Sequence, residues 1–180
     1  EKRKVAREKI TEILNILSGT KALDDAFYIL NSGRYEFKNK GIDLFINALG
    51  KLNKSSELNK EIVAVIAVPA NISGIYKELE YRRDGKKPIE GHTDLPCTHH
   101  IFGYEYDAVL NSLRENGLNN NSEDKVKVMF VPSYLNGNDG VFNLKYNDFL
   151  YAFDLTVFPS YYEPWGYTPM ESIAHGIPTV

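Results

Sequence analysis

Seven consecutive apolar residues, Ile62-Val63-Ala64-Val65-Ile66-Ala67-Val68, decide the fold of this chain. A strand that is apolar on both faces belongs in a parallel sheet with helices on each side, because both of its faces are buried. Shorter apolar or aromatic runs at 27–30, 126–131 and 155–159 are predicted as three further strands. Since helical patterns alternate with these strands, we predict an α/β fold with a doubly wound, mostly parallel sheet.

Apolar residues at helical spacing predict the helices that connect these strands. The first helix ends at Ser18-Gly19, because a glycine after the last apolar residue is typical of a helix end. The second begins near Gly41 or Ile42, the fourth covers 146–152, and the fifth runs through 171–174. The residues expected to face the core are Ile10, Ile13, Leu14 and Leu17 in the first helix, Leu44, Phe45, Ala48, Leu49 and Leu52 in the second, and Phe102, Tyr106, Val109, Leu110 and Leu113 in the third.

Length and composition indicate one domain over residues 1–180, long enough to bury a core. The formal net charge of −3 excludes a strongly basic nucleic-acid-binding module. A single cysteine, Cys97, is typical of a reduced, cytoplasmic protein, and no apolar run approaches the roughly 20 residues of a membrane-spanning helix. The polar stretch at about 77–97 is predicted to be an exposed excursion. The chain ends on the apolar segment 177–180, as if a strand were cut, so we expect a piece of a larger protein.

The loop at 33–41 is the first candidate for chemistry. It follows a predicted strand, precedes a helix, and places Arg34, Lys38 and Lys40 within seven residues. Ligands of doubly wound sheets bind beyond the carboxyl ends of the strands, and long cations beside a helix N-terminus favour phosphate oxygens. The loop is neither a Walker A sequence nor a GxGxxG fingerprint. It is therefore either a clamp for a diphosphate or a solvated basic loop.

The loop at 160–171 is the second candidate. Two carboxylates, Glu163 and Glu171, stand eight positions apart, and Trp165 lies between them. The backbone N–H groups of Gly166, Tyr167 and Thr168 would be available at the start of the following helix, where they can bind an anion. Alternatively, Glu171 only compensates the helix dipole and the aromatic side chains only pack.

The two segments 33–41 and 158–169 together resemble glycogen synthase of the animal and fungal type. The second segment also contains the E-x7-E element, Glu163 to Glu171, which is found in many retaining GT-B glycosyltransferases. The resemblance implies a Rossmann-like C-terminal domain that binds UDP-glucose. It also implies that the N-terminal domain, which carries the glucan acceptor, is missing from this chain. We therefore expect the 180 residues alone to be inactive.

The resemblance also implies a role for each site residue. Arg34 and Lys40 match the cations that contact the donor diphosphate, and Glu163 matches a catalytic carboxylate near the donor glucose, as nucleophile or as stabiliser. Lys38 is left without a functional role. The matches to other donor contacts are Glu171 for the ribose, the backbone of Gly166, Tyr167 and Thr168 for phosphate, and Tyr146 and Tyr134 for the uracil ring.

No cofactor beyond the donor substrate and no metal site are predicted. The adjacent pair His99-His100 would point apart and has no acidic or cysteine partner at ligand spacing. The expected partners are a nucleotide sugar, a glucan acceptor and the missing GT-B domain, and neither nucleic acid nor a membrane. The resemblance implies a longer insertion at the position of about 71–97, which helps to build the family's oligomer. Because the stretch in this chain is much shorter, no oligomeric state is predicted.

Two other functions remain open at this point. One is a retaining GT-B glycosyltransferase with a different acceptor, such as a surface polysaccharide. The other is a non-catalytic domain that binds a sugar nucleotide or a glucan. The choice between UDP-glucose and ADP-glucose is also open, although the resemblance favours UDP.

Overall fold

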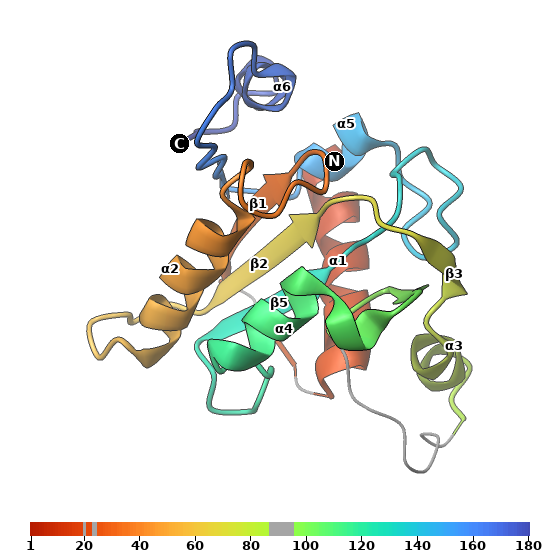
Figure 1. Cartoon of the computed structure of the whole chain (residues 1–180). Coiled ribbons are helices and arrows are strands. Elements are labelled where there is room, and N and C mark those ends of the chain that lie inside the picture. The colour runs from red at the N-terminus through yellow and green to blue at the C-terminus, as the bar shows by residue number, and fades with distance from the viewer. Residues whose placement is uncertain (20, 23–24, 87–95) are drawn as a thin grey trace.

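The computed structural model describes residues 1–19, 21–22, 25–86 and 96–180. Its centre is a sheet of four parallel strands in the order β5-β2-β1-β6 (Figure 1). These strands are β1 (Phe27–Ser32), β2 (Ile62–Ala67), β5 (Val126–Phe130) and β6 (Leu155–Thr156). The α/β fold with a doubly wound parallel sheet is therefore confirmed, although β6 is shorter than predicted.

The position of β2 inside the sheet explains why its sequence is apolar throughout. All six of its residues are buried. Val63 and Val65 pack into the core on one face of the sheet, whereas Ala64 and Ile66 pack into the core on the other. Successive side chains of a strand point to opposite faces, and both faces of β2 are covered. A polar side chain at any position of β2 would therefore be buried.

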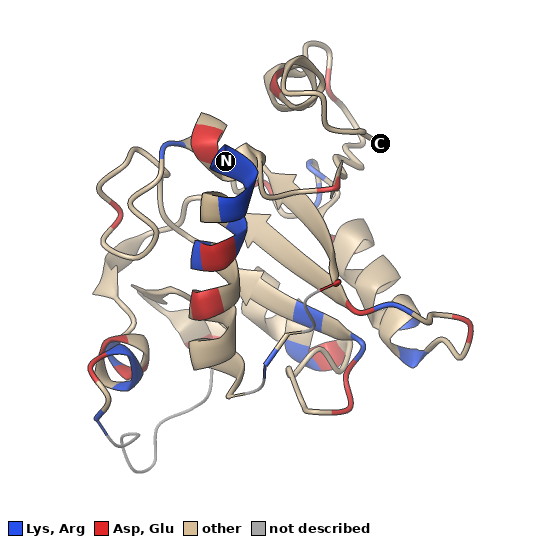
Figure 2. Cartoon of the chain, turned by 180° about the vertical axis from the view of Figure 1, so that it is seen from behind, with Lys and Arg blue, Asp and Glu red and all other residues tan. Residues whose placement is uncertain are grey.

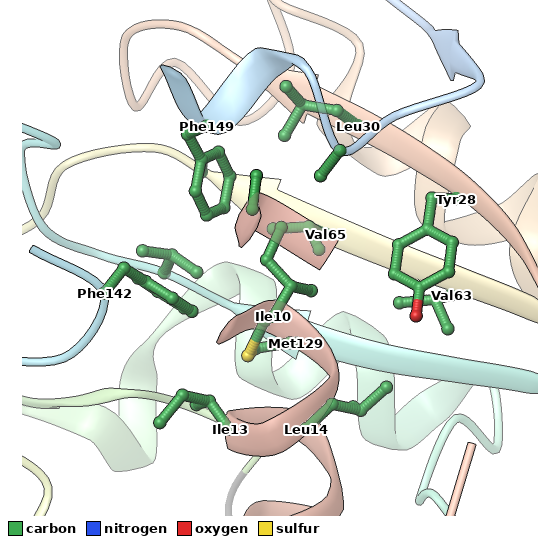
Figure 3. Packing of buried hydrophobic residues seen from close by; sticks show 14 of the residues in the cluster. Ile10, Ile13, Leu14, Tyr28, Leu30, Val63, Val65, Met129, Phe142 and Phe149 are labelled. Atoms are coloured by element: carbon green, nitrogen blue, oxygen red, sulfur yellow. The ribbon is translucent and has the colours of Figure 1, made fainter. Parts of the chain in front are cut away.

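Helices α1 (Lys2–Ser18) and α5 (Tyr146–Leu150) cover one face of the sheet, and α3 (Lys77–Arg83) packs beside them. Figure 3 shows Ile10 and Leu14 of α1 in the same buried cluster as Val65 of β2 and Met129 of β5. The predicted apolar face of the first helix is confirmed, because Ile10, Ile13, Leu14 and Leu17 are all buried. Gly19 ends the helix in the left-handed conformation, as its position predicts.

Helices α2 (Ile42–Lys54) and α4 (Ala108–Glu115) cover the opposite face. The predicted face of α2 is right for Phe45 and Leu49 but wrong for Leu44, Ala48 and Leu52, which are all exposed. Ile42 and Ile46 point to the sheet instead. The buried stripe of α2 therefore contains Ile42, Phe45, Ile46 and Leu49, and it is rotated around the helix axis from the predicted stripe.

The predicted third helix begins too early. Phe102 and Tyr106, which were expected to face the core, are 59% and 86% exposed. Phe102 precedes the single turn η1 (Tyr104–Tyr106) and Tyr106 ends it. Helix α4 starts only after Asp107, whose Oδ1 accepts a hydrogen bond from Leu110 N–H. The helical spacing of the two aromatic residues was therefore coincidental, whereas an aspartate three positions before Leu110 is a typical N-cap.

The prediction of an exposed excursion at about 77–97 is wrong at both of its ends. Leu79 and Glu78 of α3 are buried, and so is Cys97. The short antiparallel pair β3 (Ile72–Ile75) and β4 (His99–Ile101), which was not predicted, flanks this region. Residues 87–95 lie outside the described part of the chain.

The strand order determines where a ligand can bind. The chain runs from β1 outward to β2 and β5, and then returns through α5 to β6 on the other side of β1. The loops after β1 and β6 therefore separate at a topological switch point, which is where open α/β sheets form their binding crevices. Helix α6 (Tyr167–Ala174) follows β6 and projects from the body of the sheet (Figure 1). Among the described residues, no helix combines the length and the apolar character needed to cross a membrane.

A charged cluster fastens α1 to the start of β6 on the face seen in Figure 2. The carboxylate of Asp154 accepts a hydrogen bond from Tyr28 N–H at 2.9 Å, pairs with Arg7 at 2.5 Å, and also pairs with Arg3. Burial opposes ionisation, but the Tyr28 N–H and the two arginines hold the pKa of Asp154 below its usual value.

We expect Asp154→Asn to lower the free energy of unfolding at pH 7 by about 2 kcal/mol, because two charged hydrogen bonds are lost. Since the folded-state pKa of Asp154 lies below the unfolded one, its stabilisation is present above about pH 4 and is lost as the pH falls further. Urea unfolding at pH 7 and pH 3 measures both effects. The control Asp148→Asn removes only the more exposed pair with Lys2 and should cost less. Equal losses in the two variants would contradict the prediction.

Candidate functional site

A cavity of about 880 Å³ lies at the carboxyl ends of the parallel strands. Its walls come from the loops after all four strands and from the first turns of α5 and α6. Two of these loops, 33–41 and 160–171, are the candidate loops of the sequence, and Ala67 and Pro69 at the end of β2 also line the cavity. All the predicted site residues except Gly166 line it: Arg34, Lys40, Glu163, Glu171, Tyr167, Thr168, Tyr146 and Tyr134.

The loop after β1 is a tight turn that leads directly into α2. Lys40 N–H donates to the carbonyl of Glu36 at 2.9 Å, and Gly41 N–H donates to the carbonyl of Lys38 at 2.9 Å. These bonds turn the side chain of Lys40 into the cavity, while Lys38 points outward, is 78% exposed, and pairs with Asp43 at 2.7 Å. Lys38 does not line the cavity.

The loop after β6 is fastened to this turn. Tyr161 N–H donates to the carbonyl of Asn39 at 3.0 Å, so the two backbones are in direct contact. At the same place Lys40 Nζ forms an ion pair with Glu163 Oε2. The Lys40 side chain is only 15% exposed and that of Glu163 28%. Residues 123 positions apart in the sequence therefore form one cluster in the cavity wall.

Arg34 provides the second cation. Its Nε lies 3.2 Å from Glu36 Oε1, and its side chain is 78% exposed. The charged residues of the described lining are then two cations, Arg34 and Lys40, and two carboxylates, Glu163 and Glu171. Cations of this kind bind phosphate oxygens, and carboxylates accept hydrogen bonds from sugar hydroxyls, so the cavity can hold a phosphorylated sugar derivative.

Tyrosine side chains form much of the remaining wall. Tyr146, at the start of α5, shares a hydrogen bond of 2.7 Å with the hydroxyl of Ser32 at the end of β1. Burial, together with the charge of Glu171, raises the pKa of Tyr146 to about 12, so its hydroxyl is protonated near neutral pH. Tyr134 is 74% exposed at the rim. Aromatic rings at these two positions can contact a flat heterocycle.

Helix α6 contributes its first turn to the cavity. Tyr167 and Thr168 line it, and the first N–H groups of a helix have no partners within the helix. Gly166 is the described residue just before this turn and does not line the cavity itself. Of the three predicted anion donors, only Tyr167 and Thr168 therefore line the cavity. Glu171 lines the cavity one turn further along the helix.

Sequence reasoning missed Tyr35. This side chain lines the cavity next to Arg34, donates its hydroxyl hydrogen to Asp107 Oδ2 at 2.7 Å, and accepts from Val109 N–H at 3.2 Å. Burial raises the pKa of its phenol. It ties the loop after β1 to the start of α4. Asn31 and Ser32 were also missed, and two polar residues at the end of an apolar strand are the signal that could have found them.

The histidine pair does point apart, as predicted. His99 is buried, with Nδ1 at 2.8 Å from the Thr98 hydroxyl and Nε2 at 2.8 Å from the carbonyl of Asp139, whereas His100 is exposed. Burial lowers the pKa of His99. Within the described ranges, no three His, Cys, Asp or Glu side chains are placed to hold a metal ion together.

Comparison with known proteins gives one consistent family. The glycogen synthase family model matches residues 5–79 and 90–180. The chain is 33% identical to glycogen [starch] synthase isoform 1 of Saccharomyces cerevisiae, 34% to glycogen [starch] synthase of Caenorhabditis elegans and 30% to the liver glycogen [starch] synthase of Rattus norvegicus. Each match covers 88% of this chain.

The chain spans about 30% of the length of these relatives, 31%, 31% and 30% respectively. The residues between the two matched ranges, 80–89, fall within the stretch at about 71–97, which is shorter than the family's insertion at this place. Both cavity loops, 33–41 and 158–171, lie inside the matched ranges. The chain therefore belongs to the glycogen synthase family.

Proposed function

We propose that this chain is the donor-binding domain of a retaining glucosyltransferase that extends an α-1,4-glucan from UDP-glucose. The observation that carries the proposal is the meeting of two cations, Arg34 and Lys40, with two carboxylates, Glu163 and Glu171, around one cavity at the switch point of the sheet. The printed names of the matched relatives favour a glucan as the product. The single cysteine favours a cytoplasmic location.

The chemistry assigns a task to each charged side chain. As the acceptor hydroxyl forms its bond to the anomeric carbon, the bond from that carbon to UDP breaks, negative charge develops on the β-phosphate, and the hydroxyl proton passes to the departing phosphate oxygen. Arg34 and Lys40 stabilise this charge, because fixed cations act most strongly where charge develops in the transition state. Glu163 stabilises the positive charge at the anomeric carbon, and Glu171 accepts hydrogen bonds from the ribose hydroxyls. Tyr146 packs on the uracil ring.

UDP is expected to bind the 180-residue chain with a dissociation constant below about 1 mM, since the cavity and its charged groups lie within the chain. Trp165 lines the cavity and is 63% exposed, so its fluorescence reports occupancy. A titration of Trp165 fluorescence with UDP should saturate, and uridine should bind more weakly because it lacks the diphosphate. Absence of a saturable response at millimolar UDP would contradict the proposal. A parallel titration with ADP separates the two nucleotides.

The acceptor is tested on the enzyme that contains this chain together with an acceptor domain. Incubation with UDP-glucose and glycogen should lengthen the glucan, whereas a transferase for another polysaccharide would leave glycogen unchanged. The 180 residues alone are expected to bind UDP without turnover, because the acceptor side of the cleft comes from a second domain.

A further inference from the structure

The ion pair between Lys40 and Glu163 has a consequence for ligand selectivity. In the proposed reaction Lys40 binds the diphosphate and Glu163 contacts the sugar. In the structure, however, Lys40 and Glu163 form an ion pair with each other. A phosphate oxygen that contacts Lys40 Nζ must therefore compete with the carboxylate of Glu163. Because both side chains are largely but not fully shielded from water, with exposed fractions of 15% and 28%, this competition is stronger than it would be at an exposed surface.

The backbone holds the two groups in this arrangement. The loops that carry them are joined by the hydrogen bond from Tyr161 N–H to the carbonyl of Asn39, next to Lys40. On the other side of Lys40, Gly41 lies directly against the carbonyl of Pro159. The lysine and the carboxylate are thus brought together by the fold, not by two long side chains that meet by chance.

Arg34 provides an internal contrast. It also pairs with an acid, Glu36, but its side chain is 78% exposed and its partner lies two residues away on the same loop. Exposed pairs of this kind contribute little, because water solvates both ions. A diphosphate can therefore recruit Arg34 at little cost, whereas it must compete with Glu163 for Lys40.

We infer that Glu163 determines specificity, in that it makes the cavity discriminate against nucleoside diphosphates that lack a sugar. A free nucleoside diphosphate competes with Glu163 for Lys40 and offers the carboxylate nothing in return. A sugar nucleotide competes in the same way but offers sugar hydroxyls to Glu163. The carboxylate therefore weakens binding of the product, UDP, relative to the donor, UDP-glucose. This inference rests on the proposed function.

Titration calorimetry of the 180-residue chain with UDP and with UDP-glucose tests the inference. Glu163→Gln keeps the size of the side chain and removes its charge, so it should bind UDP about tenfold more tightly than the unaltered chain. The preference for UDP-glucose over UDP should fall in the same variant. Equal UDP affinity in the two proteins would overturn the inference while leaving UDP binding itself established.

A double-mutant cycle distinguishes competition for Lys40 from simple repulsion of phosphate. In the Lys40→Met background, Glu163→Gln should change the UDP affinity by less than about twofold, because the lysine is no longer there to be released. A similar gain in both backgrounds would overturn the inference in favour of repulsion. The control Glu36→Gln, at the exposed pair with Arg34, should stay within about twofold. If neither the chain nor its variants bind UDP, the proposed function fails as well.

Discussion

If the proposed function holds, Lys40→Ala in the full-length protein is expected to reduce glucosyl transfer by about a hundredfold to a thousandfold, since one fixed charge facing the leaving group is lost. The loss should appear mainly in kcat, because the charge on the β-phosphate develops in the transition state. Folding should suffer little. The partner left behind, Glu163, is 28% exposed at the cavity wall and remains in contact with water. Initial rates with UDP-glucose and thermal unfolding of the same preparation measure the two effects separately.

The chain offers a matched control two residues away. Lys38 has the same side chain on the same turn, but it is 78% exposed, pairs with Asp43 and does not line the cavity. Lys38→Ala should therefore leave turnover within about twofold of the unaltered enzyme. A large drop in melting temperature with unchanged kinetics in Lys40→Ala would contradict the assigned role, as would equal kinetic losses in the two variants.

The fold could be predicted where burial allows only one pattern of apolar residues in the sequence. The residues of β2 must be apolar because helices cover both faces, and the period of α1 leaves one stripe that can face the sheet. The errors arose where two patterns overlapped. Phe102 and Tyr106 continue the helical spacing of α4, and only the N-cap at Asp107 shows that they precede it. The strands β3 and β4 have four and three residues, too few for a period.

The candidate site was predictable as a set of residues but not as an arrangement. Strand order places the loops 33–41 and 158–171 beside one another, so both could be chosen without knowing their contacts. The pairing of Lys40 with Glu163 depends on side-chain geometry across 123 residues and has no signature in either loop alone. Tyr35 was missed for a similar reason, because its partner Asp107 belongs to a distant helix.

Gly41→Ala is expected to lower the free energy of unfolding by about 3 kcal/mol, which combines overpacking with left-handed strain. Gly41 has a φ of +63°, and a Cβ built on it would lie 1.9 Å from the carbonyl oxygen of Pro159. That oxygen belongs to rigid backbone, so the two loops must separate. For a chain of this size the melting temperature should fall by about 6–12 °C, which calorimetry measures directly.

The same substitution should damage ligand binding, because Gly41 sits between the α2 N-terminus and Lys40. Separation of the loops breaks the bond from Tyr161 N–H to Asn39 and draws Lys40 away from the cavity, so UDP affinity should fall about tenfold. Gly103→Ala is the matched control. Its φ of +69° imposes the same strain, but a Cβ there meets no atom within 4 Å, so it should cost only about 1 kcal/mol and leave UDP binding unchanged. Equal destabilisation by both variants would show that strain, and not the close approach of the two loops, requires glycine at position 41.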